Sequence, residues 1–119
     1  MANNSILKQK GEDFAVRIVN CYKYLLNSKN EKTLSMQMLR SGTSIGANIC
    51  EALDAQSRND FINKLSISLK ENHETQYWLN VLFRSDYIDY HQYQSMTNDN
   101  EEIKKIIIAT IKTTKQNGL

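Results

Sequence analysis

The chain has 119 residues, of which 40% are hydrophobic and 24% are charged, and its formal net charge is +2. This length fits one domain with one hydrophobic core, and the composition excludes a disordered chain. No apolar run approaches the roughly 20 residues that span a membrane. Residues 1–10 lack the apolar core and the cleavage site of a secretion signal. We therefore expect a cytoplasmic protein that contacts no membrane.

The residue types that form turns and strands are scarce. The sequence contains no proline and four glycines, and no segment alternates strictly between apolar and polar residues. We therefore predict a single all-α domain over residues 1–119. It is an antiparallel up-down-up-down four-helix bundle with helices at about residues 5–26, 29–55, 58–84 and 90–115.

The first two predicted helices are amphipathic, with apolar residues at three- and four-residue spacing. Ser28 and Glu31 have the spacing of a capping box, which predicts that the second helix starts near Lys29. Cys21 and Cys50 fall among apolar neighbours, so we expect two buried free thiols. The apolar rows consist of Phe14, Ile18, Cys21, Tyr22 and Leu25 in the first helix and of Leu34, Met38, Ile45, Ile49 and Leu53 in the second.

The third and fourth predicted helices begin with capping signals. Ser57 with Asp60, and Asp89 with Gln92, can each satisfy a backbone N–H at a helix start. Residues 98–100 are weak helix formers and allow a break in the fourth helix. The apolar rows consist of Phe61, Leu65, Leu69, Leu79 and Phe83, interrupted by Asn72 and Gln76, and of Tyr93, Met96, Ile103 and Ile107.

The second helix has an unusually uncharged surface. Between residues 33 and 53 the only charged side chains are Arg40 and Glu51, although an outer helix of a monomeric bundle keeps a charged face toward water. In the third helix, Ile67, Trp78 and Val81 lie off the row that faces the bundle interior. A bundle covers only one side of each helix, so these second apolar surfaces predict self-association.

Two glycines and a polar stripe also lie in the second helix. Gly42 and Gly46 are four residues apart, and each costs about 1 kcal/mol of helix stability relative to alanine, so we expect close helix packing that offsets this cost. Polar residues of the second and third helices can share one side. We expect a buried structural network that fixes helix register and subunit orientation, with a ligand or metal site as the alternative. Its members are Arg40, Ser41, Ser44, Asn48, Glu51, Lys70, Glu71 and Glu74.

Basic residues concentrate toward the two ends of the chain. Residues 1–40 carry seven basic and three acidic side chains, residues 41–100 four and eight, and residues 101–119 four and two. If the first and last helices lie side by side, their basic residues can form one positive surface for nucleic acid, and a solvated helix face is the alternative. These residues are Lys8, Lys10, Arg17, Lys23, Lys104, Lys105, Lys112 and Lys115.

Each catalytic or metal-binding motif is incomplete. Glu71 is followed three residues later by Glu74 rather than by the histidine of a di-iron Glu-x-x-His pair. His73 and Glu74 begin the H-E-x-x-H pattern of zinc proteases, but Tyr77 occupies its closing position. We therefore predict a non-enzymatic protein without a cofactor or metal. For the aromatic residues around the last turn we expect packing, with base stacking as the alternative; they are Tyr77, Trp78, Tyr87, Tyr90 and Tyr93.

Two stretches of the sequence resemble a known family. Residues 39–52, L-R-S-G-T-S-I-G-A-N-I-C-E-A, and residues 60–79, D-F-I-N-K-L-S-I-S-L-K-E-N-H-E-T-Q-Y-W-L, are similar to the motifs of the bacterial four-helix bundle family named after 23S rRNA intervening sequences. The resemblance implies a homopentameric ring and places the eight polar residues named above at the family's matching positions. The related accessory variability determinant of diversity-generating retroelements is a basic pentamer that binds a reverse transcriptase and nucleic acid. This chain departs from it in its weak net charge.

Patterning and resemblance together predict an oligomeric interaction protein of unassigned activity, acting as an accessory to RNA or to a nucleic-acid enzyme. A scaffold that binds another protein is the first alternative. A small-ligand binder that uses the carboxylates of Glu51, Glu71 and Glu74 is the second.

Overall fold

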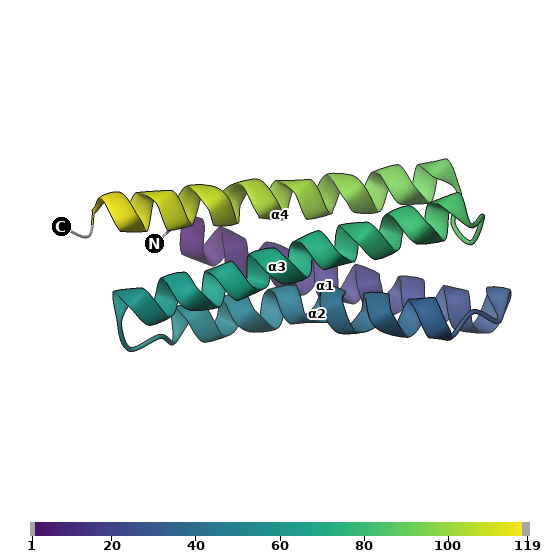
Figure 1. The fold of residues 1–119 in the computed structure, drawn as a ribbon, viewed down its shortest axis with the longest axis horizontal. Coiled ribbons are helices and arrows are strands. Elements are labelled where there is room, and N and C mark those ends of the chain that lie inside the picture. Colours follow the sequence, from purple (N-terminus) through teal and green to yellow (C-terminus); the bar gives the residue numbers. More distant parts are fainter. Residues whose placement is uncertain (1, 118–119) are drawn as a thin grey trace.

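The computed structural model describes residues 2–117 and consists of four antiparallel helices in a rod of 51 × 22 × 20 Å (Figure 1). The helices are α1 (Ala2–Lys29), α2 (Thr33–Leu53), α3 (Arg58–Arg84) and α4 (Tyr90–Gln116). Each helix packs against the next one along the chain, and α4 also contacts α1. The start of α1 and the end of α4 therefore lie at the same end of the rod (Figure 1). The predicted all-α four-helix bundle is confirmed.

The apolar rows of all four helices meet in one core. Fully burying a side chain the size of leucine or phenylalanine stabilises a fold by about 1.5–3 kcal/mol, so this core is the main source of stability. Most residues of the predicted rows are buried or packed against the core. The buried apolar residues are Leu7, Phe14, Ile18, Leu25, Met38, Ile45, Ile49, Ala52, Leu65, Leu79, Leu82, Ile88, Met96, Ile103 and Ile107.

The connection between α1 and α2 differs from the sequence prediction. Ser28 still belongs to α1, and Asn30 has a φ of 53°, a left-handed conformation that turns the chain. The Glu31 carboxylate then accepts hydrogen bonds from the backbone N–H groups of Leu34, at 3.0 Å, and Ser35, at 2.7 Å. The predicted Ser28 cap is therefore wrong, because Glu31 alone reaches the N–H groups that open α2.

The other two helix starts carry the expected caps. The Ser57 hydroxyl accepts from the Asp60 N–H at 3.0 Å. Asp89 and Gln92 form a reciprocal capping box, in which each side chain accepts the other residue's backbone N–H. The fourth helix continues through residues 98–100 without a break, because Asn100 is buried and hydrogen-bonded to α3.

Candidate functional site

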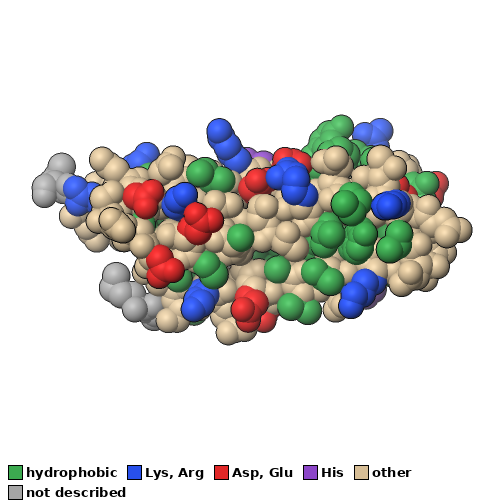
Figure 2. Space-filling model, turned by 90° about the horizontal axis from the view of Figure 1, so that it is seen from below, with side chains coloured by type: hydrophobic (Ala, Val, Ile, Leu, Met, Phe, Trp, Pro, Cys, Tyr) green, Lys and Arg blue, Asp and Glu red, His purple; other side chains and the backbone are tan. Residues whose placement is uncertain are grey.

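The outward side of α2 carries a continuous row of uncharged residues, here called the α2 stripe: Met36, Leu39, Thr43, Ala47 and Cys50. Met36 exposes 44% of its surface, Ala47 and Cys50 are also exposed, and Leu39 and Thr43 are half-buried. In Figure 2, which views the rod from the side where α2 lies, apolar side chains gather in the right half of the face. No other part of residues 2–117 covers these groups completely.

Glycines bring α2 against α1 at the inner edge of this stripe. A Cβ atom added to Gly46 would lie 2.9 Å from the Gly11 carbonyl oxygen and 3.0 Å from the Gly11 carbonyl carbon. A Cβ atom added to Gly42 would meet the Ile18 side chain at 2.7–2.9 Å. Both glycines therefore permit a close approach within one chain, and Gly11 is a partner that the sequence analysis did not identify.

Arg40 joins α2 to α3 through two carboxylates. Its guanidinium lies 2.6 Å from a Glu74 carboxylate oxygen and 3.2 Å from a Glu71 carboxylate oxygen. The Trp78 indole N–H donates to the same Glu74 oxygen at 3.0 Å. The hydrogen bonds from Arg40 and Trp78 hold the pKa of Glu74 below its usual value, and the two carboxylates raise the pKa of Arg40. Arg40 and Glu74 are therefore both ionised at neutral pH.

The other members of the predicted polar network do not form one buried stripe. Ser41 is buried, and its hydroxyl oxygen lies 2.9 Å from that of Thr75. Ser44 and Asn48 are half-buried and donate to carbonyl groups of α2 itself. Lys70 is exposed. Arg40, Glu71 and Glu74 therefore form contacts of the expected kind between α2 and α3, whereas the eight residues do not share one buried stripe.

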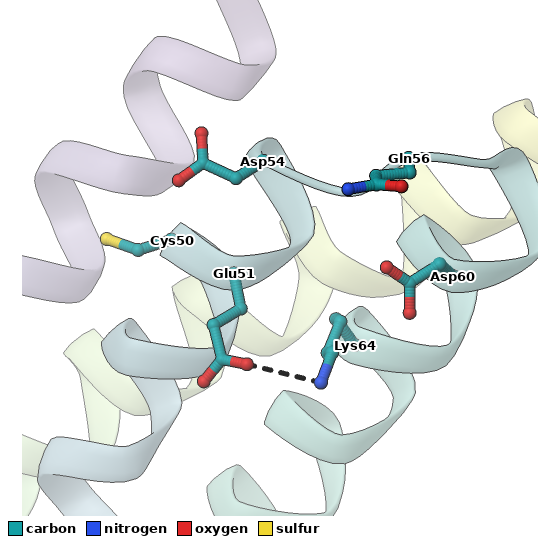
Figure 3. Close-up of a pocket in the computed structure, with 6 residues that line it drawn as sticks. All are labelled: Cys50, Glu51, Asp54, Gln56, Asp60 and Lys64. Carbon is teal, nitrogen blue, oxygen red and sulfur yellow. Dashed lines mark ion pairs between the residues drawn. The ribbon is translucent and has the colours of Figure 1, made fainter.

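A hollow of about 590 Å³ opens beside the turn between α2 and α3 (Figure 3). Glu51 and Lys64 point toward each other across it, with 3.2 Å between the Lys64 Nζ and a Glu51 carboxylate oxygen. Lys64 is thus the partner of Glu51, and the sequence analysis did not identify it. Within the part of the chain that the structure describes, no group of three or more His, Cys, Asp or Glu side chains is arranged to hold a metal ion. The lining residues are Cys50, Glu51, Asp54, Gln56, Asp60 and Lys64.

The two thiols have different surroundings. Cys21 is half-buried, and desolvation by burial raises its pKa to about 11. Cys50 is exposed on the α2 stripe. The prediction of two buried thiols is therefore wrong for Cys50, whose apolar neighbours in the sequence belong to the outward side of the helix.

Comparison with known proteins places the chain in a family. The sequence model of the 23S rRNA-intervening sequence proteins matches residues 3–109. The chain belongs to the 23S rRNA-intervening sequence protein family. A crystal structure of a Bacteroides thetaiotaomicron protein, described as a protein with unknown function from the S23 ribosomal protein family, is 57% identical to it. That structure superimposes with a TM-score of 0.92 over 92% of this chain and 98% of the other. No curated protein matches the chain.

In this family member, three of the eight basic candidate residues are already paired with acids. Lys10 lies 3.0 Å from Glu102, and Lys104 lies 3.2 Å from Glu101. Arg17 lies 2.6 Å from Asp99, and it also donates to the Ser95 hydroxyl. The expected single positive surface is therefore interrupted. Five candidates are exposed and form no ion pair within residues 2–117, namely Lys8, Lys23, Lys105, Lys112 and Lys115.

A network of side-chain amides joins α3 to α4. The Asn72 amide donates to the Asn100 side-chain oxygen at 2.8 Å, and the Asn100 amide donates to the Asn72 carbonyl at 3.0 Å. Gln76 continues the network to Asn80 and Thr97. The interruption of the apolar row by Asn72 and Gln76 was the sequence signal for this network, but their partners on α4 were not recognisable.

The aromatic residues near the last turn pack in two groups. The Phe83 ring stacks on Tyr93 with 4.6 Å between centroids and also lies 5.9 Å from the Tyr90 ring. Tyr77 and Trp78 meet edge to face at 4.9 Å.

Among the described residues, no helix is long and apolar enough to cross a membrane.

Proposed function

We propose that this chain is a non-enzymatic cytoplasmic interaction protein that assembles with copies of itself into a homopentameric ring through a surface centred on the α2 stripe. The observation that carries the proposal is the exposure of Met36, Ala47 and Cys50 on a helix face without a free charge. Exposed apolar surface marks an interaction site in soluble proteins when it extends over more than a few hundred Å². The ring size rests on the family resemblance.

The size of the stripe indicates how far the interface extends. Met36 and Cys50 are fourteen residues apart, which corresponds to about 21 Å along a helix roughly 10 Å wide. The stripe therefore offers roughly 200 Å², whereas a stable interface buries about 800 Å² on each partner. Neighbouring surfaces must contribute, and the half-buried Trp78 and Val81 of α3 and Val19 of α1 supply apolar groups of the required kind.

A pair of matched substitutions tests this assembly. Met36→Glu places a carboxylate in the stripe, whereas Ile108→Glu makes the same change on α4 at a side chain that is also 44% exposed. Burying an unpaired charge is strongly unfavourable, so Met36→Glu should dissociate the assembly and Ile108→Glu should not. Sedimentation velocity measures both, and circular dichroism verifies the fold. A monomeric wild-type chain, or equal sedimentation of the two variants and the wild type, would contradict the proposal.

We also propose that α4 supplies phosphate contacts to RNA. No acidic residue occurs between residues 103 and 119, and Lys105, Lys112 and Lys115 are exposed without ion pairs among the described residues. Five copies of a chain with net charge +2 carry about +10, enough for salt-dependent binding where the charge is clustered. Lys105 and Lys112 lie about 10 Å apart along the helix by its rise. The RNA contact is thus expected on α4 rather than along the whole α1–α4 edge.

Salt dependence tests the RNA contact. We expect a structured RNA to bind at about 50 mM salt and to bind much more weakly at about 200 mM. Lys112→Gln should lower the slope of log affinity against log salt by about 1 for each phosphate group that the variant can no longer bind. Lys23→Gln is the control, because Lys23 is exposed on α1 and lies toward the other end of the rod. Absence of binding at low salt would refute this part of the proposal.

Two other functions have weaker support. A scaffold for another protein would use the same α2 stripe, and capture of a heterologous partner that displaces the self-assembly would favour it. A small-ligand site built from Glu51, Glu71 and Glu74 has lost its basis, because all three carboxylates form ion pairs with Lys64 or Arg40.

A further inference from the structure

A second hollow, of about 270 Å³, lies between α3 and α4 away from the α2 stripe. Four neutral side-chain amides line it, together with the exposed side chains of Tyr77 and His73 and the paired charges of Glu101 and Lys104. The volume falls just below the range of about 300–1,000 Å³ for drug-sized ligands, so the hollow suits a smaller group. The amides are Asn72, Gln76, Asn80 and Asn100.

Hydrogen bonds fix the orientation of these amides. The Asn80 side-chain oxygen accepts from the Tyr93 hydroxyl at 2.6 Å and from the Gln76 amide at 3.1 Å. Both amide hydrogens of Gln76 are used, on Asn80 and Thr97, and its oxygen accepts from Asn100 at 3.2 Å. The Asn80 nitrogen donates to no group among the described residues. Asn80 therefore presents an unused donor, and Gln76 keeps one oxygen lone pair available for a ligand.

The chemistry of the hollow selects a neutral, flat ligand with adjacent donors and acceptors. The charges at its rim cancel, since Lys104 pairs with Glu101 at 3.2 Å. Tyr77 is 58% exposed, and the edge-to-face contact with Trp78 holds its ring in place. Aromatic rings stack on bases, and amide side chains pair with the donors and acceptors on base edges.

We propose that this hollow binds a nucleobase, which stacks on Tyr77 and pairs with the side chains of Asn80 and Gln76. This goes beyond the proposed function, which concerns assembly and phosphate contacts. The base belongs either to a free nucleotide or to a single strand of RNA. The residues of α4 that line the hollow lie one to five positions before Lys105, so a strand held by the exposed lysines would pass it.

Side-chain amide resonances give a direct test. The full chain is titrated with AMP, CMP, GMP and UMP, and with ribose 5-phosphate as a ligand that has the sugar and phosphate but no base. We expect at least one nucleotide to shift the Asn80 and Gln76 amide signals with a dissociation constant of about 1 mM or tighter. Ribose 5-phosphate should leave them unchanged. The proposal is wrong if no nucleotide shifts these signals, or if ribose 5-phosphate shifts them equally.

Two variants locate the contact. Tyr77→Ala should weaken nucleotide binding by about 10- to 100-fold, the usual effect of losing one base-stacking ring. Tyr90→Ala is the matched control, because Tyr90 is 63% exposed and lies outside the hollow. Asn80→Asp keeps the oxygen that accepts from Tyr93 but removes the free donor, so it should change which base binds best. Equal loss in Tyr77→Ala and Tyr90→Ala would overturn the assignment of the site.

The source of the base is resolved by a short single-stranded RNA. Binding of the RNA that is tighter than that of the free nucleotide, and that depends on Tyr77, assigns the site to a strand. Equal binding assigns it to the free nucleotide. Lys112→Gln should weaken only the RNA, so failure of the lysine contact is distinguishable from failure of the base site.

Discussion

Replacing Gly46 by alanine is expected to destabilise the protein although alanine is the better helix former. The added Cβ atom would lie 2.9 Å from the Gly11 carbonyl oxygen and 3.0 Å from its carbonyl carbon. Both are backbone atoms of α1 and cannot rotate away as a side chain can. The two helices must therefore separate locally, which loosens the packing of the core around them.

The magnitude follows from two opposing effects. Overpacking a tight contact costs about 1–3 kcal/mol, and the upper part of this range applies because a backbone has to move. The higher helix propensity of alanine recovers about 1 kcal/mol. The net loss is about 1–2 kcal/mol, which lowers the melting temperature by roughly 4–8 °C for a chain of this size.

Denaturation followed by circular dichroism measures this difference, at several protein concentrations because the proposed assembly would add to the apparent stability. Ala109→Gly is the control, because this exposed α4 side chain lies outside the α2 stripe and the substitution loses only helix propensity, about 1 kcal/mol. Gly46→Leu should destabilise more strongly and disturb sedimentation. If Gly46→Ala melts above the wild type, the close contact with Gly11 does not constrain the fold and the reasoning fails.

Other substitutions test the amide network and the thiols. Asn100→Ala should cost about 2–3 kcal/mol, because the buried Asn72 amide keeps only the Asn100 main-chain carbonyl as acceptor and the Gln76 oxygen loses its donor. The exposed Asn98→Ala should change stability by less than about 0.5 kcal/mol in chemical denaturation. Near pH 8 a maleimide should modify the exposed Cys50 quickly in a monomer and slowly in the proposed assembly, which would cover it. Cys21 should react slowly in both, because burial raises the pKa of its thiol to about 11. The folded state holds the Cys21 thiol proton more tightly than the unfolded state. The free energy of unfolding of the wild type should therefore fall relative to that of Cys21→Ala between about pH 9 and pH 11. If the two free energies changed with pH in the same way, the shift of the Cys21 pKa would be contradicted.

The sequence was sufficient for the fold because the helix signals are local. Apolar spacing located all four helices, and the Asp89–Gln92 box marked a start that the structure reproduces. The start of α2 was missed because the capping residue was a glutamate whose longer side chain reaches the N–H groups of Leu34 and Ser35, and no short spacing rule describes that contact.

The candidate surfaces depended on partners that are distant in the sequence. Arg40 and Glu71 were both singled out, but the pairing of Glu51 with Lys64 requires the relative register of α2 and α3. The same holds for Asn72 and Asn100, which are 28 residues apart and meet only because α3 and α4 run antiparallel. A single sequence gives the residue types on each helix face but not the offset between two helices.

The position of Arg40 connects the internal packing of the bundle to the proposed assembly. It is the only charged residue between residues 33 and 50, and its side chain is 51% exposed beside the α2 stripe. A lone guanidinium at that place would oppose burial by a second copy, because removing an unpaired charge from water costs several kcal/mol. Glu71 and Glu74 neutralise it and draw it toward α3. The ion pairs contribute little to stability where they are exposed, and their larger effect is to leave the face of α2 neutral enough for another subunit to cover.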